Sequence, residues 1–389
     1  MRISSTFASV ALLCIACGSN DAEKATAGNT GSDGGGGACS PPLVTENGAC
    51  IDPLRRFEPK EQLDQDNVVS YGDVALTMKL PDPPKSGFRL IVPPRVLQPG
   101  DEIEDCSAWA YPALTNRNVY AARVYTTGGL HHSNMYGVPL PASGASPYPA
   151  CAAGQADVFS QVPNILKGDI MDVLFANSTQ IQGGEQIVFP KGMAFKLKTE
   201  GREVATTIHW LNTTADTFTS EVVYDFFTMP DEDVETEIVP FVFENQGFTI
   251  PAQSEGTISM TCDLTRPANI VSIMPHTHSR ATAFDVDLVR SDDTTERIFH
   301  DGTFDTKSDI EVFDTAVSTE GFAKIHHECQ VTNDLSKPIV WGIGQNEMCT
   351  LFGYLYPPSS QLLGYVGKPG ADGQPPACIT LDIGSHRTP

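Results

Sequence analysis

The sequence is poor in basic residues and in apolar stripes at helical spacing. Its 25 Lys+Arg stand against 48 Asp+Glu, which gives a formal net charge of -23, and such a chain repels phosphate backbones and anionic headgroups. Nucleic acid is therefore not an expected partner. The scarcity of helical stripes, together with 33 Gly and 29 Pro, argues against a helical bundle and favours a mostly β protein with many turns.

The N-terminal segment is typical of export. Its apolar run Phe7–Ile15 is too short to span a membrane, as in a signal peptide. Ala16 before Cys17 resembles the lipobox of bacterial lipoproteins, although Cys14 stands where Leu is usual. We predict a signal peptide over residues 1–17, a lipid on Cys17, and an exported protein anchored on the periplasmic or outer face of a bacterial membrane. A plain signal peptide with a soluble product is the alternative.

The 389 residues are too many for one ordinary core and suit two domains. Residues 18–38 are rich in Gly and polar residues and predict a flexible linker, which an N-terminal extension follows over 39–87. Strand-like segments then continue on both sides of an acidic break at 230–237. The pattern predicts two tandem antiparallel β-sandwich domains, jelly-roll-like in kind, over 88–236 and 237–389.

The cysteines indicate disulfides. Ten cysteines become eight once Cys14 and Cys17 are set aside, and an even number in an exported chain is typical of a disulfide framework. Cys39 and Cys50 bracket a short loop, so a local bridge between them is the simplest pairing. The other pairings stay open, since eight cysteines allow about 105 connectivities.

Two histidine pairs are candidate metal ligands. His276 and His278 stand two apart, and on an extended strand such residues project from the same face. His131 and His132 are adjacent and would face opposite ways, so they could share one metal only at a bend or bulge. The preceding Gly128-Gly129 makes such a distortion cheap.

Other candidates are weak when each is taken alone. His326 and His327 lie in a segment that alternates as a regular strand does, so a surface or packing role is expected for them. His209, in a strand-like segment, would be a core histidine by itself. Met348 would be core packing.

The order and context of these segments resemble the copper type II, ascorbate-dependent monooxygenases, the family of peptidylglycine α-hydroxylating monooxygenase and dopamine β-monooxygenase. The resemblance covers most of residues 88–385 and includes the runs Phe189–Gly192 and Glu347–Cys349. It implies two copper sites, each with three ligands. These are His131, His132 and His209 for the electron-transfer copper, and His276, His278 and Met348 for the oxygen-activating copper.

The resemblance also implies three disulfides, which join Cys106 to Cys151, Cys262 to Cys378, and Cys329 to Cys349. The last bridge would fix Cys349 on one face of its strand and hold Met348 towards the metal on the other. A thioether ligand favours Cu(I) and so supports copper. A three-histidine site by itself would equally suit zinc.

The chemistry that the resemblance implies is hydroxylation of an activated C–H bond in a small-molecule substrate. Ascorbate or a similar electron donor would reduce both coppers, O2 would react at the His276, His278 and Met348 site, and the other copper would supply the second electron across an interdomain cleft. Copper is the source of this reactivity, and the protein positions the reactants.

The substrate is less defined. Peptide-amidating members hold a carboxylate with Arg, Asn and Tyr where this sequence has Met274, Thr350 and Phe352, so a peptide ending in glycine is not expected. The segment from Arg297 to Asp314 looks more like the dopamine β-monooxygenase branch. Two rival functions remain, a copper-binding or electron-transfer lipoprotein without hydroxylase turnover and a structural β adhesin.

Overall fold

The computed structural model describes residues 44–46, 49–61, 67–70, 73–139, 172–177, 183–302, 310–342, 345–366 and 378–382. Within these residues the chain forms strands and short 3-10 turns without any α-helix, so the predicted mostly β class is confirmed. The described part has no helix long and apolar enough to cross a membrane. The predicted signal peptide, the linker and Cys17 lie outside the described residues.

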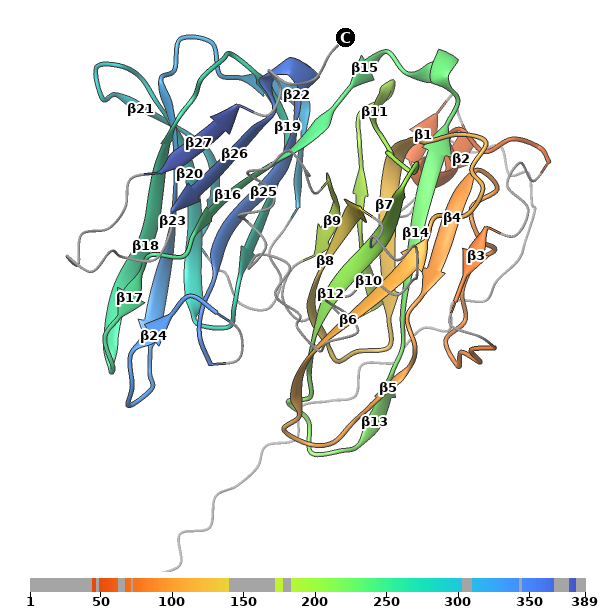
Figure 1. Ribbon diagram of the computed structural model, residues 1–389, viewed down its shortest axis with the longest axis horizontal. Coiled ribbons are helices and arrows are strands. Elements are labelled where there is room, and N and C mark those ends of the chain that lie inside the picture. The colour runs from red at the N-terminus through yellow and green to blue at the C-terminus, as the bar shows by residue number, and fades with distance from the viewer. Residues whose placement is uncertain are drawn as a thin grey trace, which may run out of the picture.

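The N-terminal sandwich is built from two sheets (Figure 1). In one sheet the described strands follow the order β15-β11-β7-β14-β4-β3, and β10 pairs with β7. These strands are β3 (Val68–Val69), β4 (Gly87–Ile91), β7 (Asn118–Thr126), β10 (Gly183–Val188), β11 (Met193–Lys196), β14 (Val222–Met229) and β15 (Thr236–Glu237). The other sheet has the order β6-β12-β8-β9. Its strands are β6 (Glu102–Ala110), β8 (Leu130–Pro139), β9 (Asp172–Asn177) and β12 (Arg202–Leu211).

The C-terminal sandwich repeats this two-sheet plan. One sheet has the described order β22-β19-β25-β16-β26-β27 and the other β18-β23-β20-β21. The first contains β16 (Val239–Asn245), β19 (Asn269–Thr277), β22 (Glu311–Ser318), β25 (Cys349–Tyr356), β26 (Leu362–Val366) and β27 (Ile379–Asp382). The second contains β18 (Ser254–Asp263), β20 (Ala281–Val289), β21 (Thr295–Asp301) and β23 (Lys324–Asn333). Two β-sandwiches are therefore the architecture, as predicted.

Smaller elements complete the described chain. Three strand pairs lie outside the main sheets. They are β1 (Val44–Glu46) with β2 (Ala49–Ile51), β5 (Arg95–Leu97) with β13 (Phe218–Ser220), and β17 (Thr249–Ile250) with β24 (Ile339–Val340). The 3-10 turns are η1 (Pro53–Arg55), η3 (Asp231–Asp233) and η4 (Pro358–Ser360).

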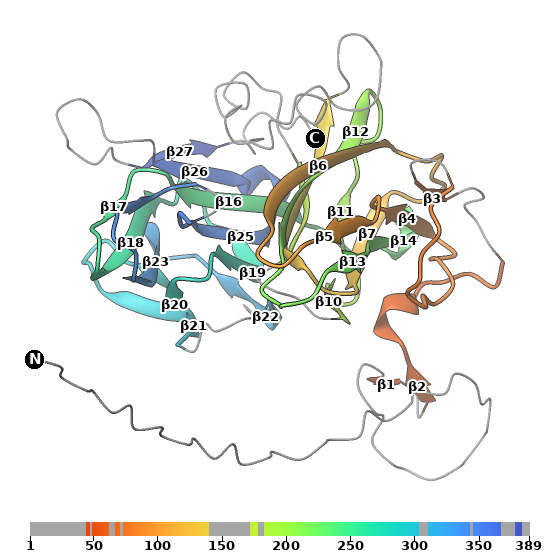
Figure 2. The same ribbon diagram turned by 90° about the horizontal axis from the view of Figure 1, so that it is seen from below.

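The two sandwiches share an apolar interface. Strands β16, β19 and β25 are buried along almost their whole length, because one face of their sheet covers the C-terminal core and the other meets the N-terminal sandwich (Figure 2). Tyr354 illustrates the contact: its hydroxyl donates to the carbonyl of Leu174 at 2.9 Å, and its ring lies 4.7 Å from that of Phe189. Strands buried on both faces have near-continuous apolar sequences, as these do.

Disulfides fasten the C-terminal sandwich. Cys262 is bonded to Cys378 and Cys329 to Cys349, which are the two bridges that the resemblance implies for this half. Cys50 and Cys106 are also disulfide-bonded. Their predicted partners, Cys39 and Cys151, lie outside the described residues.

Candidate metal centre

The pair His131-His132 lies at a β-bulge. In the pairing of β8 with β12, His132 faces His209 and Leu130 faces Trp210, so His131 is the extra residue. A bulge turns neighbouring side chains that would otherwise point to opposite faces. Gly128 and Gly129 have positive φ values of 111° and 77°, which glycine adopts without strain. The predicted distortion of this strand is thus confirmed.

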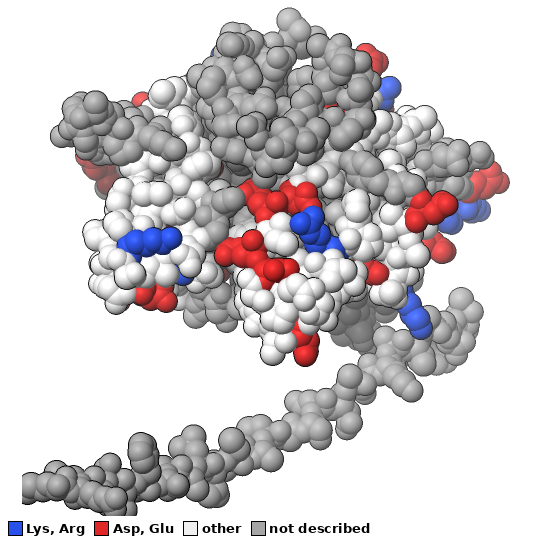
Figure 3. All heavy atoms as spheres, turned by 60° about the horizontal axis from the view of Figure 1, so that its bottom comes forward, with Lys and Arg blue, Asp and Glu red and all other residues white. Residues whose placement is uncertain are grey.

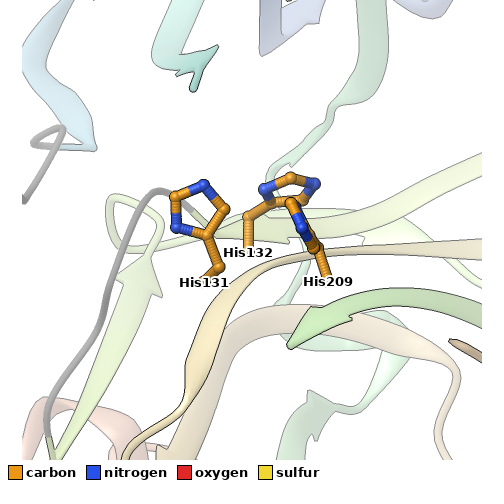
Figure 4. Close-up of side chains that lie close together, drawn as sticks. All are labelled: His131, His132 and His209. Carbon is orange, nitrogen blue, oxygen red and sulfur yellow. The ribbon is translucent and has the colours of Figure 1, made fainter. Parts of the chain in front are cut away.

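The bulge brings three imidazoles together. Figure 4 shows the side chains of His131, His132 and His209 close together. The ring of His131 lies 5.1 Å from that of His132 and 4.8 Å from that of His209. One nitrogen from each ring falls within 4.8 Å of the others. We call these three residues the N-terminal triad.

His276 and His278 extend the cluster from the C-terminal sandwich. They lie at the end of β19 and just beyond it, with ring centroids 5.8 Å apart, and share a face as their spacing predicts. A nitrogen of each lies within 4.8 Å of a nitrogen of His132. We call His132, His276 and His278 the C-terminal triad.

His132 therefore belongs to both triads. Its ring is 4.5 Å from that of His276 and stacks on His278 at 4.9 Å with an interplanar angle of 16°. The resemblance had assigned His132 to the N-terminal copper alone, with the second site across a cleft. In this structure the five histidines form one continuous cluster at the interface of the two sandwiches.

Burial keeps these imidazoles neutral. The five residues are only 2% to 4% exposed. Burial lowers the pKa of His209 to about 4 and, with neighbouring histidines adding to the effect, those of His276 and His278 to about 3. The pKa values of His131 and His132 are also lowered, first by burial and then by the charges of nearby histidines. Neutral imidazole is the form that binds metals.

The unsatisfied nitrogens fit a metal. Among the described residues, no hydrogen-bond partner contacts Nδ1 of the N-terminal triad, either ring nitrogen of His276, or Nε2 of His278. Buried polar atoms normally have partners, so these orphaned nitrogens indicate a ligand, because each ring also places a nitrogen within 4.8 Å of the others in its triad. Imidazole nitrogen suits copper, zinc, iron and nickel. The residues present thus fit the copper that the resemblance implies.

Glu347 fastens the C-terminal triad to Met348. Its carboxylate is fully buried and accepts the backbone N–H groups of His278, of Arg280 at 3.2 Å and of Met348 at 2.9 Å. Burial raises its pKa to about 7. The Glu347 carboxylate links two segments that are far apart in sequence, and it places the backbone of Met348 next to that of His278.

The predicted soft ligand, Met348, directly precedes β25 and is buried. In that strand, Cys349 pairs with Thr277, the residue between His276 and His278. A third imidazole near His276 and His278 comes from His132, which sequence spacing did not indicate. The role of Met348 as a ligand stays a prediction.

His326 and His327 stand apart from the cluster. His327 is buried and stacks on Phe284 at 5.7 Å, and its Nε2 lies 3.3 Å from the carbonyl of Cys349. His326 contacts Thr261 on the outer face of the sheet. Neither belongs to a histidine triad in the described chain, so the expected surface and packing roles are confirmed.

The positions at which peptide-amidating members of the resembled family hold a carboxylate are uncharged and buried here. Met274 and Phe352 belong to the hydrophobic cluster that spans the two sandwiches, and the ring of Phe352 lies 6.1 Å from that of His276. Thr350 is also buried, next to them in the sheet. None of these side chains carries a charge that could hold a carboxylate.

Metal-free protein is expected to lose stability as the pH falls from about 6.5 towards 4. The pKa values of the five cluster histidines and of His327 are lowered on folding, so the unfolded chain takes up protons that the folded chain does not. The contribution of these neutral histidines to stability is fully present above about pH 6.5 and is lost progressively below it. Glu347 has the opposite effect because its pKa is raised on folding, but it is one group against six histidines.

Urea unfolding midpoints between pH 4.5 and 7 measure this effect. Val96→Ala is a suitable control because Val96 is exposed and does not titrate, and it should leave the slope unchanged. A midpoint that stays level or rises on acidification would contradict the burial of neutral histidines.

One protein-family model matches a part of the chain that contains some of these residues. Residues 236–364 match the family described as "Copper type II ascorbate-dependent monooxygenase, C-terminal domain". This segment contains His276, His278, Glu347 and Met348. No curated protein matches the chain.

Several solved structures are similar at low identity. The PBSX exported protein XepA is 7% identical, with 70% of this chain and 88% of that chain covered and a TM-score of 0.20. The major capsid protein P2 of bacteriophage PM2 is 10% identical, with 67% and 97% covered and a TM-score of 0.25. TM-scores as low as these do not support a conclusion about function.

Proposed function

We propose that this protein is a copper-dependent monooxygenase that hydroxylates an activated C–H bond with O2 and a one-electron reductant such as ascorbate. The five buried histidines form two triads with metal-ligand spacing and have unsatisfied ring nitrogens; this cluster carries the proposal, and the family match over 236–364 supports it. Copper, when bound, supplies the one-electron redox chemistry and the activation of O2.

The chain's own residues orient and protect the site. The carbonyl of Asn346 accepts Nδ1–H of His278 at 3.1 Å, which leaves Nε2 free to act as a ligand. Glu347 holds the backbone on either side. The apolar residues Met274 and Phe352 cover the interface beside His276 and limit the access of water.

The substrate class that we propose follows from the uncharged side chains near His276. Since Met274, Thr350 and Phe352 offer no cation, we propose a small substrate that needs no carboxylate anchor. A lipid anchor at Cys17 on an exported protein also remains a proposal.

Oxygen uptake tests the function. Copper-loaded protein with ascorbate, screened over aromatic amines and small C–H compounds, should consume O2 in proportion to hydroxylated product. His300→Ala, which changes an exposed histidine, should retain this activity. Copper binding without substrate-dependent uptake would instead support the rival function of copper storage or electron transfer, which the deep burial of all five histidines favours.

Met348→Ile should abolish hydroxylation and remove copper–sulfur scattering from the X-ray absorption spectrum of the reduced protein, because thioether sulfur is the soft donor that Cu(I) prefers. Sulfur scattering that survives the substitution, or that is missing from wild type, would show that Met348 is only packing.

A further inference from the structure

A carboxylate lies at the outer edge of the N-terminal triad. Glu102 is the first residue of β6, which pairs with β12 so that Glu102 faces Leu211. His209 and Leu211, two apart on β12, project from the same face. Register therefore places Glu102 diagonal to His209, and its Oε1 lies 3.2 Å from Nε2 of His209.

The two nitrogens of His209 have different surroundings. Nε2 faces the carboxylate of Glu102, whereas Nδ1 is buried and has no hydrogen-bond partner in the described part of the chain. A neutral imidazole carries one N–H, and an ionised carboxylate only accepts. The contact therefore favours the proton on Nε2 and leaves the lone pair on Nδ1.

We propose that Glu102 is a positioning residue of the N-terminal triad: its carboxylate holds His209 in the Nε2–H tautomer, which leaves Nδ1 as the ligand atom. This inference rests on the proposed copper function. A hydrogen bond to the second nitrogen of a ligating histidine fixes both its tautomer and its ring orientation. The carbonyl of Asn346 has the complementary contact with His278, where Nδ1 is the bonded nitrogen.

The contact differs from an ordinary surface ion pair. The side chain of Glu102 is 35% exposed, but that of His209 is only 3% exposed, so the carboxylate meets the buried ring from the solvent side. Acidic side chains gather near the middle of the molecular face shown in Figure 3. Glu102 differs from an acidic side chain that only faces solvent because it contacts Nε2 of a histidine whose Nδ1 is buried without a partner in the described chain.

The test uses the full chain with 15N-labelled histidine. Long-range 1H–15N spectra of the metal-free protein report the His209 tautomer, and stepwise Cu(I) competition with a chromophoric chelator reports affinity. We expect the Nε2–H tautomer in wild type. Glu102→Ala should mix the tautomers and weaken one of the two coppers by about 10–100-fold.

Matched variants separate positioning from general effects. Glu102→Gln keeps an acceptor oxygen and should restore the tautomer and most of the affinity. Glu200→Ala, at a side chain 91% exposed, should change neither. An Nδ1–H tautomer in wild type, or unchanged tautomer and affinity in Glu102→Ala, would overturn the proposal. So would the loss of a copper–oxygen neighbour in the X-ray absorption of Glu102→Ala, because Glu102 would then be a ligand itself.

These measurements do not depend on turnover. If the tautomer and affinity respond as expected but no substrate is hydroxylated, the proposed function fails and the role of Glu102 stands. If hydroxylation occurs and the Glu102 variants bind copper as wild type does, only the inference about Glu102 fails.

Discussion

His132→Ala is expected to weaken both copper sites, by about 100-fold or more at each, and to abolish hydroxylation. The reason is that nitrogens of His132 lie within 4.8 Å of ligand nitrogens in both triads. Changes outside the ligand shell already cost about 10–100-fold, and removing a ligand should cost at least as much. Stepwise Cu(I) competition measures both sites in one titration.

His131→Ala is the matched control because it removes a neighbouring buried imidazole that belongs to one triad only. It should weaken a single copper. If His132→Ala also weakens only one, the two sandwiches hold their coppers separately in solution, as the resemblance implied, and the shared position of His132 is not used.

Glu347→Ala should lower the free energy of unfolding by on the order of 3 kcal/mol or more. The substitution leaves three N–H groups, those of His278, Arg280 and Met348, without their acceptor. A buried donor without an acceptor costs about 1–3 kcal/mol. Copper binding to the C-terminal triad should weaken as well, since the same bonds hold His278 in place. Denaturant unfolding of metal-free protein and Cu(I) competition provide the two measurements.

Two further variants calibrate this result. Glu347→Gln retains one acceptor oxygen and should lose less stability. Glu296→Ala breaks an exposed ion pair with Arg290, and such pairs contribute only about 0–1 kcal/mol. A Glu347→Ala protein as stable as Glu296→Ala would show that the carboxylate is not the acceptor for these N–H groups.

Local sequence determined the fold class and much of the site. Turn residues and strand alternation indicated β-sandwiches, because side-chain direction on a strand repeats every two residues. The same rule placed His276 and His278 on one face and separated His326 from His327. Glycines before His131 indicated the bulge, because only glycine adopts those backbone angles without strain.

Tertiary structure alone decided how the two halves meet. His132 lies more than a hundred residues from His276, and no local periodicity reports that their rings lie 4.5 Å apart. The contacts of Glu102 with His209 and of Glu347 with His278 and Met348 were also not predicted from the sequence, although Glu347 belongs to the run Glu347–Cys349 that carries the resemblance. Their roles depend on strand register and on the burial of their partners. Both are decided by packing between segments that lie far apart in the sequence.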